Sequence, residues 1–495
     1  MKRSAGILMH ITSLPSNYGI GTFGKQAYKF ADFLKESGQN YWQILPIGPT
    51  GYGNSPYTSY STFAGNMLLI DLDLLIKDNL LEEKFVNSFD WGSDPTCVDY
   101  DKILCNKDIV LRKAFENFKK GNQSKFLEFI EKNETWLDDY AVYMTARKFY
   151  GDISWEEWPN KALSLYEKTA INEFKANNED EITFWKFTQF LFFTQWFALK
   201  NYCNEQGIKI IGDIPIYVPL DSSDVWANSK CFCLDQDKKP TCVSGCPPDA
   251  FSPTGQLWGH PIYNWNYMKN DNYAWWMLRI KQLSKLFDVT RIDHFRGFDT
   301  YYSIPNDGKK DAVSRGKWCN GPGYEFFEVL KEKFDDNVEI IAEDLGTMTK
   351  SVEKLLKKTG FPGMKVLLLT FDSRDESIVR PHDFTSNYVI YTGTHDNDTV
   401  MGWLKYADKT DVNYATNYLH ITKDEPYNWG MIRGAYQSVC NLAIIPMQDL
   451  LGLGSDARMN TPSTVGHNWQ WRLKKDVDLK DVTKKLLELC KIYER

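Results

Sequence analysis

The stretch Val289-Thr290-Arg291-Ile292-Asp293-His294-Phe295-Arg296-Gly297 decides how the rest of this sequence is interpreted. Its β-branched start predicts a short strand that ends in a cluster of charged residues. Arg291 and Asp293 are two positions apart, so on a strand their side chains point to the same side. A guanidinium beside a carboxylate keeps that carboxylate ionised at neutral pH, which suits a nucleophile better than a proton donor. An isolated Arg-x-Asp pair is more often a plain salt bridge, so the interpretation depends on the other motifs.

Length and composition narrow the class of protein. The chain has 495 residues, more than one compact core usually contains, so we expect a large barrel or sandwich with insertions, or several domains. Aromatic residues make up 15% of the sequence. They can stack on sugar rings, although an aromatic-rich core is an equally good explanation. The net charge of -7 gives no electrostatic footprint for nucleic acid or anionic lipid as a partner.

The N-terminal residues 1–9 combine a basic pair with an apolar run, as a signal peptide does. The run is too short, His10 interrupts it and no small-residue cleavage site follows, so a first strand is the better interpretation. No stretch approaches the roughly 18 consecutive apolar residues of a membrane span. We therefore expect a cytoplasmic protein whose ten cysteines are reduced thiols.

Short apolar runs that end in polar or Gly/Pro clusters recur along the chain. They are residues 6–11, 41–47, 208–218, 287–295, 338–345, 364–369, 388–392 and 442–450. Segments with helical periodicity at 24–37, 324–334 and 350–359 follow three of them. Strand–helix–strand repeats imply parallel pairing, and eight such strands predict an α/β fold, a (β/α)8 TIM barrel.

Two gaps between these runs are long enough to be insertions. Residues 70–205, between strands 2 and 3, contain helical patterns at 80–87, 107–120, 124–149 and 183–206 and predict a mostly helical insertion subdomain. Residues 219–276, after strand 3, are aromatic and loop-like, so we expect a loop-rich insertion. The whole chain, 1–495, should be a single catalytic barrel domain, with too few residues after the eighth run for a C-terminal β-domain.

Charged residues follow four of the predicted strands, and catalytic groups of a (β/α)8 barrel lie at the C-terminal ends of its strands. Asp213 ends the third run, Asp293 the fourth, Glu343 the fifth, and Asp396 follows the seventh. Adjacent strands are ~4.8 Å apart. Carboxylates on the fourth and fifth strands can therefore stand ~5 Å apart, the separation found in retaining glycosidases.

This spacing assigns a role to each carboxylate. Asp293, paired with Arg291, would be the nucleophile. Glu343 has the acid Asp344 beside it and follows an apolar strand, so its pKa should be raised and it would act as general acid and then base. Asp396 could accept hydrogen bonds from sugar hydroxyls and hold the reacting ring distorted.

Three motifs carry a resemblance to a known family. Arg-Ile-Asp-His at 291–294, Ala-Glu-Asp-Leu-Gly at 342–346 and Thr-His-Asp-Asn at 394–397 resemble the catalytic regions of the α-amylase superfamily. The chain as a whole resembles the 4-α-glucanotransferases (amylomaltases, or disproportionating enzymes) of glycoside hydrolase family 77. The resemblance runs through the motifs at 13–21, 45–57, 212–218, 247–259 and 467–469.

The resemblance implies the same roles for Asp293, Glu343 and Asp396. It also implies that Arg291 and His395 contact the nucleophile and the reacting sugar, and that Asp213 and Tyr57 complete this subsite. Finally, it implies a mobile loop over the cleft at 247–256, bearing Phe251 and Gln256, and an acceptor-side platform at Trp258.

Taken alone, several of these residues have simpler explanations. Tyr57 would be a loop aromatic, Asp213 a strand-end cap and Trp258 loop packing. His294 has two explanations, because it either lines the cleft or satisfies a backbone group behind Asp293.

Four cysteines depart from the family pattern. Cys231, Cys233, Cys242 and Cys246 loosely resemble a zinc knuckle, but the central loop is short. Reduced thiols are the favoured interpretation. A redox switch is an alternative, since Cys246 lies next to the loop that has to close.

The sequence therefore predicts an enzyme that cleaves an α-1,4-glucan, retains the fragment on Asp293 and transfers it to the 4-hydroxyl of glucose or another α-1,4-glucan. No cofactor or metal is expected, because this chemistry needs carboxylates and binding aromatics. Maltooligosaccharides are the expected partners, and the oligomeric state is not indicated. The alternatives are an α-1,4-glucan hydrolase with the same carboxylates and a non-catalytic glucan-binding barrel, which would not need to keep an acid/base.

Overall fold

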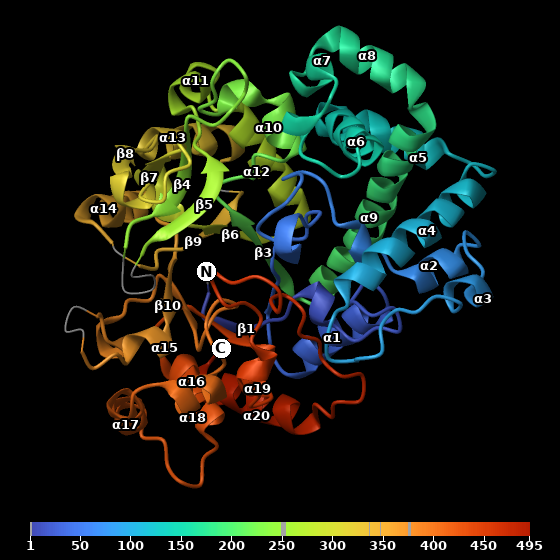
Figure 1. Ribbon diagram of the computed structural model, residues 1–495. Coiled ribbons are helices and arrows are strands. Elements are labelled where there is room, and N and C mark those ends of the chain that lie inside the picture. Colours follow the sequence, from blue (N-terminus) through green and yellow to red (C-terminus); the bar gives the residue numbers. More distant parts are fainter. Residues whose placement is uncertain (1, 249–253, 336, 347, 375–377) are drawn as a thin grey trace.

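Eight parallel strands form a barrel at the centre of the computed structural model, which describes residues 2–248, 254–335, 337–346, 348–374 and 378–495 (Figure 1). Each strand overlaps one of the predicted apolar runs, so the predicted barrel is confirmed. The strands are β1 (Ser4–Leu8), β2 (Tyr41–Gln43), β3 (Lys209–Pro215), β6 (Val289–Asp293), β9 (Glu339–Ala342), β10 (Gly363–Val366), β11 (Tyr388–Tyr391) and β12 (Leu442–Pro446).

Parallel ladders join the strands in the order β10, β11, β12, β1, β2, β3, β6 and β9. The ring closes between β9 and β10, where the backbone N–H of Ala342 donates to the carbonyl of Pro362 at 2.9 Å. Closure brings the C-terminal ends of all strands to one mouth. The first strand, β1, lies within the N-terminal residues 1–9, for which the sequence predicted a strand.

Helices surround the barrel, and three of them confirm the predicted segments at 24–37, 324–334 and 350–359. These are α1 (Lys25–Glu36), α13 (Tyr324–Phe334) and α14 (Lys350–Thr359). The remaining helices that follow β3 are α10 (Ser223–Ala227), α11 (Trp265–Asn270), α12 (Ala274–Leu286), α15 (Leu367–Thr370), α16 (Val400–Tyr406), α17 (Lys409–Tyr418), α18 (Tyr427–Gln437), α19 (Met447–Leu450) and α20 (Lys480–Tyr493).

The segment between β2 and β3, where the sequence predicted an insertion, is mostly helical. It contains α2 (Leu72–Lys77), α3 (Glu83–Val86), α4 (Tyr100–Phe118), α5 (Ser124–Lys132), α6 (Glu134–Phe149), α7 (Lys161–Ser164), α8 (Lys168–Asn177) and α9 (Glu179–Glu205). The pattern at 124–149 forms two helices that meet at Asn133. Figure 1 shows these helices gathered on one side of the barrel, with α9 leading back to it.

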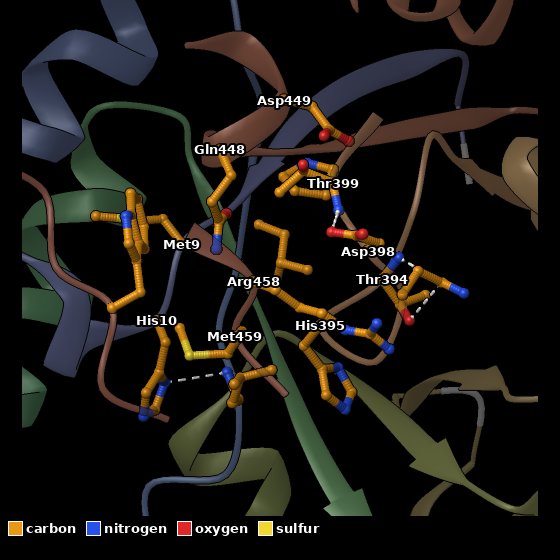
Figure 2. Close-up of a pocket in the computed structure, with 15 residues that line it drawn as sticks. Met9, His10, Thr394, His395, Asp398, Thr399, Gln448, Asp449, Arg458 and Met459 are labelled. Atoms are coloured by element: carbon orange, nitrogen blue, oxygen red, sulfur yellow. Dashed lines mark hydrogen bonds between the residues drawn. The ribbon is translucent and has the colours of Figure 1, made fainter. Parts of the chain in front are cut away.

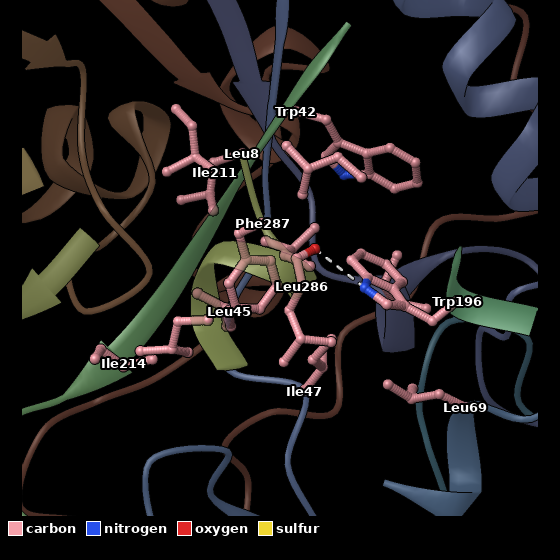
Figure 3. Packing of buried hydrophobic residues seen from close by; sticks show 14 of the residues in the cluster. Leu8, Trp42, Leu45, Ile47, Leu69, Trp196, Ile211, Ile214, Leu286 and Phe287 are labelled. Carbon is pink, nitrogen blue, oxygen red and sulfur yellow. Dashed lines mark hydrogen bonds between the residues drawn. The ribbon is translucent and has the colours of Figure 1, made fainter. Parts of the chain in front are cut away.

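Large apolar side chains fill the space between α9, α12 and the barrel wall (Figure 3). The indole Nε1 of Trp196 on α9 donates to the carbonyl of Leu286, the last residue of α12, at 3.1 Å. Phe287 then packs directly over Gly212 of β3. A Cβ atom at Gly212 would lie 2.2 Å from that ring, so the close packing of β3 requires glycine there.

The segment after β3 is more regular than the sequence predicted. Within 219–276, β4 (Cys242–Cys246) and β5 (Gln256–Pro261) join a four-stranded antiparallel sheet with β7 (Thr300–Pro305) and β8 (Lys317–Asn320). Strands β4 and β5 pair with each other within this segment. The other two strands, β7 and β8, follow β6, so 219–276 alone contains no signal for their part of the sheet. The sheet lies beside the barrel mouth and carries Gln256 and Trp258 on β5.

After β12 the described chain contains α19, a long loop and α20. None of the helices in the described part of the chain is long and apolar enough to cross a membrane.

Candidate active site

A cleft opens at the C-terminal ends of the barrel strands, with about 2920 Å³ of free space including its opening to solvent. The predicted site residues that line it are Tyr57, Gln256, Trp258, Arg291, Asp293, His294, Glu343, His395 and Asp396. Asp213 lies behind this wall, fully buried. Phe251 lies outside the described residues.

Arg291 on β6 holds two carboxylates together. Its Nη1 lies 2.7 Å from both oxygens of Asp213, and its Nη2 lies 2.9 Å from Oδ1 of Asp293. The strand register explains this, because Asp213 on β3 pairs directly with Arg291. Arg291 and Asp293 point to the same side, as their spacing predicted. Asp293 ends the strand and reaches the cleft with 33% of its side chain exposed.

Two opposing effects act on Asp293. The positive charge of Arg291 lowers the pKa of this carboxyl, as the sequence suggested. The dense protein around it raises the pKa more, so the net shift is upward. Asp293 thus keeps a charge partner but is more basic than an exposed aspartate.

Glu343 follows β9 and is held by backbone groups. Its Oε1 accepts from the N–H of Leu345 at 2.7 Å and its Oε2 from the N–H of His294 at 2.8 Å. Burial, and next the negative charge of Asp293, raise the pKa of Glu343 to about 8. The sequence had attributed this shift partly to Asp344. Asp344 instead accepts from the N–H of Met364 at 2.6 Å, so Asp293 is the acid that raises the pKa.

Asp396 reaches the cleft from the loop after β11, on the other side of the mouth. Its Oδ1 lies 3.3 Å from Nε2 of His395. The ring of His395 stacks on that of Tyr57 with centroids 5.0 Å apart, and the Tyr57 hydroxyl donates to Oδ2 of Asp213 at 2.9 Å. A continuous set of contacts therefore joins Asp396 to Arg291, Asp213 and Asp293, which we call the Arg291 cluster.

Trp258 and His294 form a separate aromatic wall. Their rings meet edge to face with centroids 4.7 Å apart, and the indole N–H of Trp258 donates to Oε1 of Gln256 at 3.0 Å. Burial lowers the pKa of His294 to about 3, so its ring is neutral. His294 lines the cleft with its ring, while its backbone N–H binds Glu343.

Comparison with known proteins agrees with the glycosidase-like arrangement of these carboxylates. A family model for glycoside hydrolase family 77, described as 4-alpha-glucanotransferase, matches residues 9–478. The chain belongs to this family. It is an enzyme of the 4-alpha-glucanotransferase type, on a (β/α)8 barrel.

Two curated family 77 relatives show how far the similarity extends. The 4-alpha-glucanotransferase of Clostridium butyricum is 48% identical over 489 residues, which cover 98% of this chain and 100% of the relative. That of Thermus thermophilus is 42% identical over 484 residues, covering 96% of this chain and 95% of the relative.

Solved structures of amylomaltases are also similar to this chain. The amylomaltase from Streptococcus agalactiae in complex with acarbose has a TM-score of 0.96 at 43% identity, with 100% of both chains covered. The amylomaltase from Corynebacterium glutamicum, at 17% identity, shares the fold with a TM-score of 0.79, over 98% of this chain and 75% of that one.

The family 77 cleft also contains residues that the sequence analysis did not single out. Asn460 and Arg458 contact Asp396 from the loop after β12. Trp318 on β8 is 44% exposed, and the guanidinium of Arg296 lies 4.0 Å from its ring centroid. No periodicity marks Arg458 or Asn460. Trp469 packs on Tyr57 and His395. The sequence could have identified it, because it ends the family motif at 467–469.

A smaller pocket lies behind His395 (Figure 2). His10 lines it and accepts a hydrogen bond from the N–H of Leu45 at 3.2 Å. Burial lowers the pKa of His10 to about 3, so this histidine is neutral. The loop that carries Asp396 also lines this pocket, through Thr394, His395, Asn397 and Asp398.

The four cysteines singled out in the sequence, Cys231, Cys233, Cys242 and Cys246, are reduced thiols. Cys233 and Cys242 share a hydrogen bond, which raises the pKa of Cys233 and lowers that of Cys242. Among the described residues, no group of three or more His, Cys, Asp or Glu side chains is arranged to hold a metal ion.

Proposed function

We propose that Asp293, Glu343 and Asp396 transfer a segment of an α-1,4-glucan by a retaining double displacement. The acceptor is the 4-hydroxyl of glucose or of a second α-1,4-glucan. The observation that supports this most directly is the placement of Asp293 and Glu343 at the ends of adjacent strands β6 and β9. Strands ~4.8 Å apart suit a nucleophile and an acid that act without a water between them.

In the first step, Asp293 attacks the anomeric carbon while Glu343 gives its proton to the departing 4-oxygen. The bond to the leaving glucan breaks as the bond to Asp293 forms. A pKa of about 8 keeps Glu343 protonated at neutral pH. The hydrogen bond from Nη2 of Arg291 favours the ionised form of Asp293 and holds it in place.

In the second step, Glu343 is a carboxylate and takes the proton from the acceptor hydroxyl. That oxygen attacks the anomeric carbon and displaces Asp293, which restores both residues and inverts the centre a second time. Asp396 acts in both steps, because it accepts hydrogen bonds from hydroxyls of the ring as positive charge develops on it. The geometry around Asp396 is fixed by Tyr57, Asp213 and His395.

Maltotriose incubated alone with the enzyme tests this assignment. Transfer gives glucose together with maltopentaose and longer products, so the number of reducing ends stays constant. Asp293→Asn should lower the rate of product formation by several orders of magnitude, while the thermal unfolding midpoint stays the same. Glucose and maltose without longer products would indicate a hydrolase. Label from a trapped glycosyl-enzyme on any residue other than Asp293 would overturn the nucleophile.

A further inference from the structure

The loop after β12 runs along the loop that carries Asp396 and holds its backbone. Nη2 of Arg458 donates to the carbonyl oxygen of Asp396 at 2.6 Å, and its Nε donates to the carbonyl of Asn460 at 2.7 Å. The N–H of Asn460 in turn donates to the carbonyl of His395 at 3.1 Å. Figure 2 shows Arg458 beside His395 and Thr394. These bonds fix where Asn460 stands relative to Asp396.

The Asn460 side chain then engages one oxygen of the Asp396 carboxylate. Its Nδ2 donates to Oδ1 at 2.6 Å, and Nε2 of His395 lies 3.3 Å from the same oxygen. Within the described chain, the other oxygen, Oδ2, has no hydrogen-bond partner. The Asp396 side chain is 45% exposed, and both Asp396 and Asn460 line the cleft.

We propose that Asn460 is a positioning residue for Asp396, locking one carboxylate oxygen so that the other faces the reacting sugar. A carboxylate that is already oriented does not have to reorganise as charge develops on the sugar. This lowers the barrier of the reaction rather than improving ground-state binding of the substrate. This inference rests on the proposed function, because it assumes that Asp396 acts in the transition state.

Asn460→Ala is the first test. Loss of the lock lets the carboxylate turn, so kcat should fall by about 10- to 100-fold while KM for maltooligosaccharides changes little. Asn468→Ala is the matched control. Asn468 braces the turn at 461–464 in the same loop through Thr461 and Thr464, and none of its hydrogen bonds in the described chain reaches Asp396.

Asn460→Asp supplies a readout that a structural role would not give. The new carboxyl has the shape of the amide, but it can donate to Asp396 only while protonated. At low pH the two carboxyls share a proton and the lock is present. As pH rises that proton is lost and two negative charges face each other. Activity relative to wild type should therefore be highest at acid pH and decline as pH rises, whereas the Asn460→Ala ratio should stay flat.

Other ionisable groups face the same place and are retained in every variant, so ratios to wild type isolate the new carboxyl. They are His395, Asp293, Tyr57 and Arg458.

Two results would overturn the inference. One is a raised KM with unchanged kcat in Asn460→Ala, which would mean that Asn460 binds sugar directly. The other is an Asn460→Asp ratio that does not vary with pH. The variant Asp396→Asn distinguishes failure of this inference from failure of the proposed function. If Asp396→Asn stays active, the role of Asp396 is wrong. If it is inactive while Asn460→Asp shows no pH effect, only the positioning role is wrong.

Discussion

At the scale of single residues, Asp293 and Glu343 differ in the groups that stabilise their charge. Asp293 receives a guanidinium donor from Arg291, whereas Glu343 receives backbone N–H groups and faces the charge of Asp293. Burial raises the pKa of both, and that of Glu343 to about 8. The two acids therefore lose their protons in separate steps, first from Asp293 and then from Glu343.

This order predicts the basic limb of the pH–rate profile. The acid form of Glu343 is present below its pKa and is lost as pH rises, so kcat/KM should fall as pH increases through about 8. Glu343→Gln should lose the limb and most activity on maltooligosaccharides, yet keep more on an α-glycosyl fluoride, whose leaving group needs no protonation. Asp344→Asn, a neighbour that faces Met364, should keep the limb. Equal losses on both donors would contradict the acid role.

Whether a site contact could be predicted depends on how close its two residues are in the sequence. Arg291 and Asp293 share one strand, so spacing alone placed them on one side. The contribution assigned to Asp344 was wrong for the same reason, because consecutive residues of an extended chain face opposite ways. Asn460 could not be found, since it meets Asp396 only where two loops from different strands run together.

At the scale of elements, the barrel strands were predictable because they are short apolar runs that are buried on both faces. The predicted helices were predictable because each buries a periodic apolar face. The sheet of β4, β5, β7 and β8 was not. Its strands are not apolar runs, as Cys-Val-Ser-Gly-Cys in β4 illustrates, and β4 pairs with β7 from beyond β6. Pairing between distant segments leaves no periodic signature in either one.

Helix α9 gives a prediction at this scale. The side-chain amide of Gln189 is fully buried, accepting from the N–H of Gly65 at 2.7 Å and donating to its carbonyl at 3.0 Å. Gln189→Leu leaves both backbone groups buried without these partners and should cost about 2–4 kcal/mol, seen as a thermal midpoint several degrees lower. Gln206→Leu, at the end of the same helix and bonded to the exposed Lys35, should change it little. Equal shifts would show that the Gly65 bonds are unimportant.

At the scale of the whole molecule, transfer has to prevail over hydrolysis. Water at ~55 M competes with a sugar at roughly millimolar levels for the same glycosyl-enzyme. For the sugar to win, its attack must be favoured by at least ~10⁴, which is about 5.5 kcal/mol. The three carboxylates are common to both outcomes, so the preference has to come from groups that orient the acceptor and exclude water.

The wall formed by Trp258 and His294 is the candidate for that preference, because it borders the cleft beside Glu343, the base that we propose activates the acceptor. A sugar stacked on the indole would present its 4-hydroxyl to that carboxylate. We therefore expect Trp258→Ala to raise the ratio of new reducing ends to glucose released from maltotriose. Truncation of Phe251, which lies outside the described residues, should act in the same direction by a smaller amount.

The adjacent residue on β5 provides the control. Leu257 is 57% exposed, and neighbouring residues of a strand face opposite sides, so Leu257→Ala should leave the ratio unchanged. If Trp258→Ala reduced hydrolysis and transfer in equal proportion, the indole would serve donor binding alone. The preference for sugar over water would then have to arise in the Arg291 cluster or in the loop that holds Asp396, where the Asn460 variants would report it as a changed ratio.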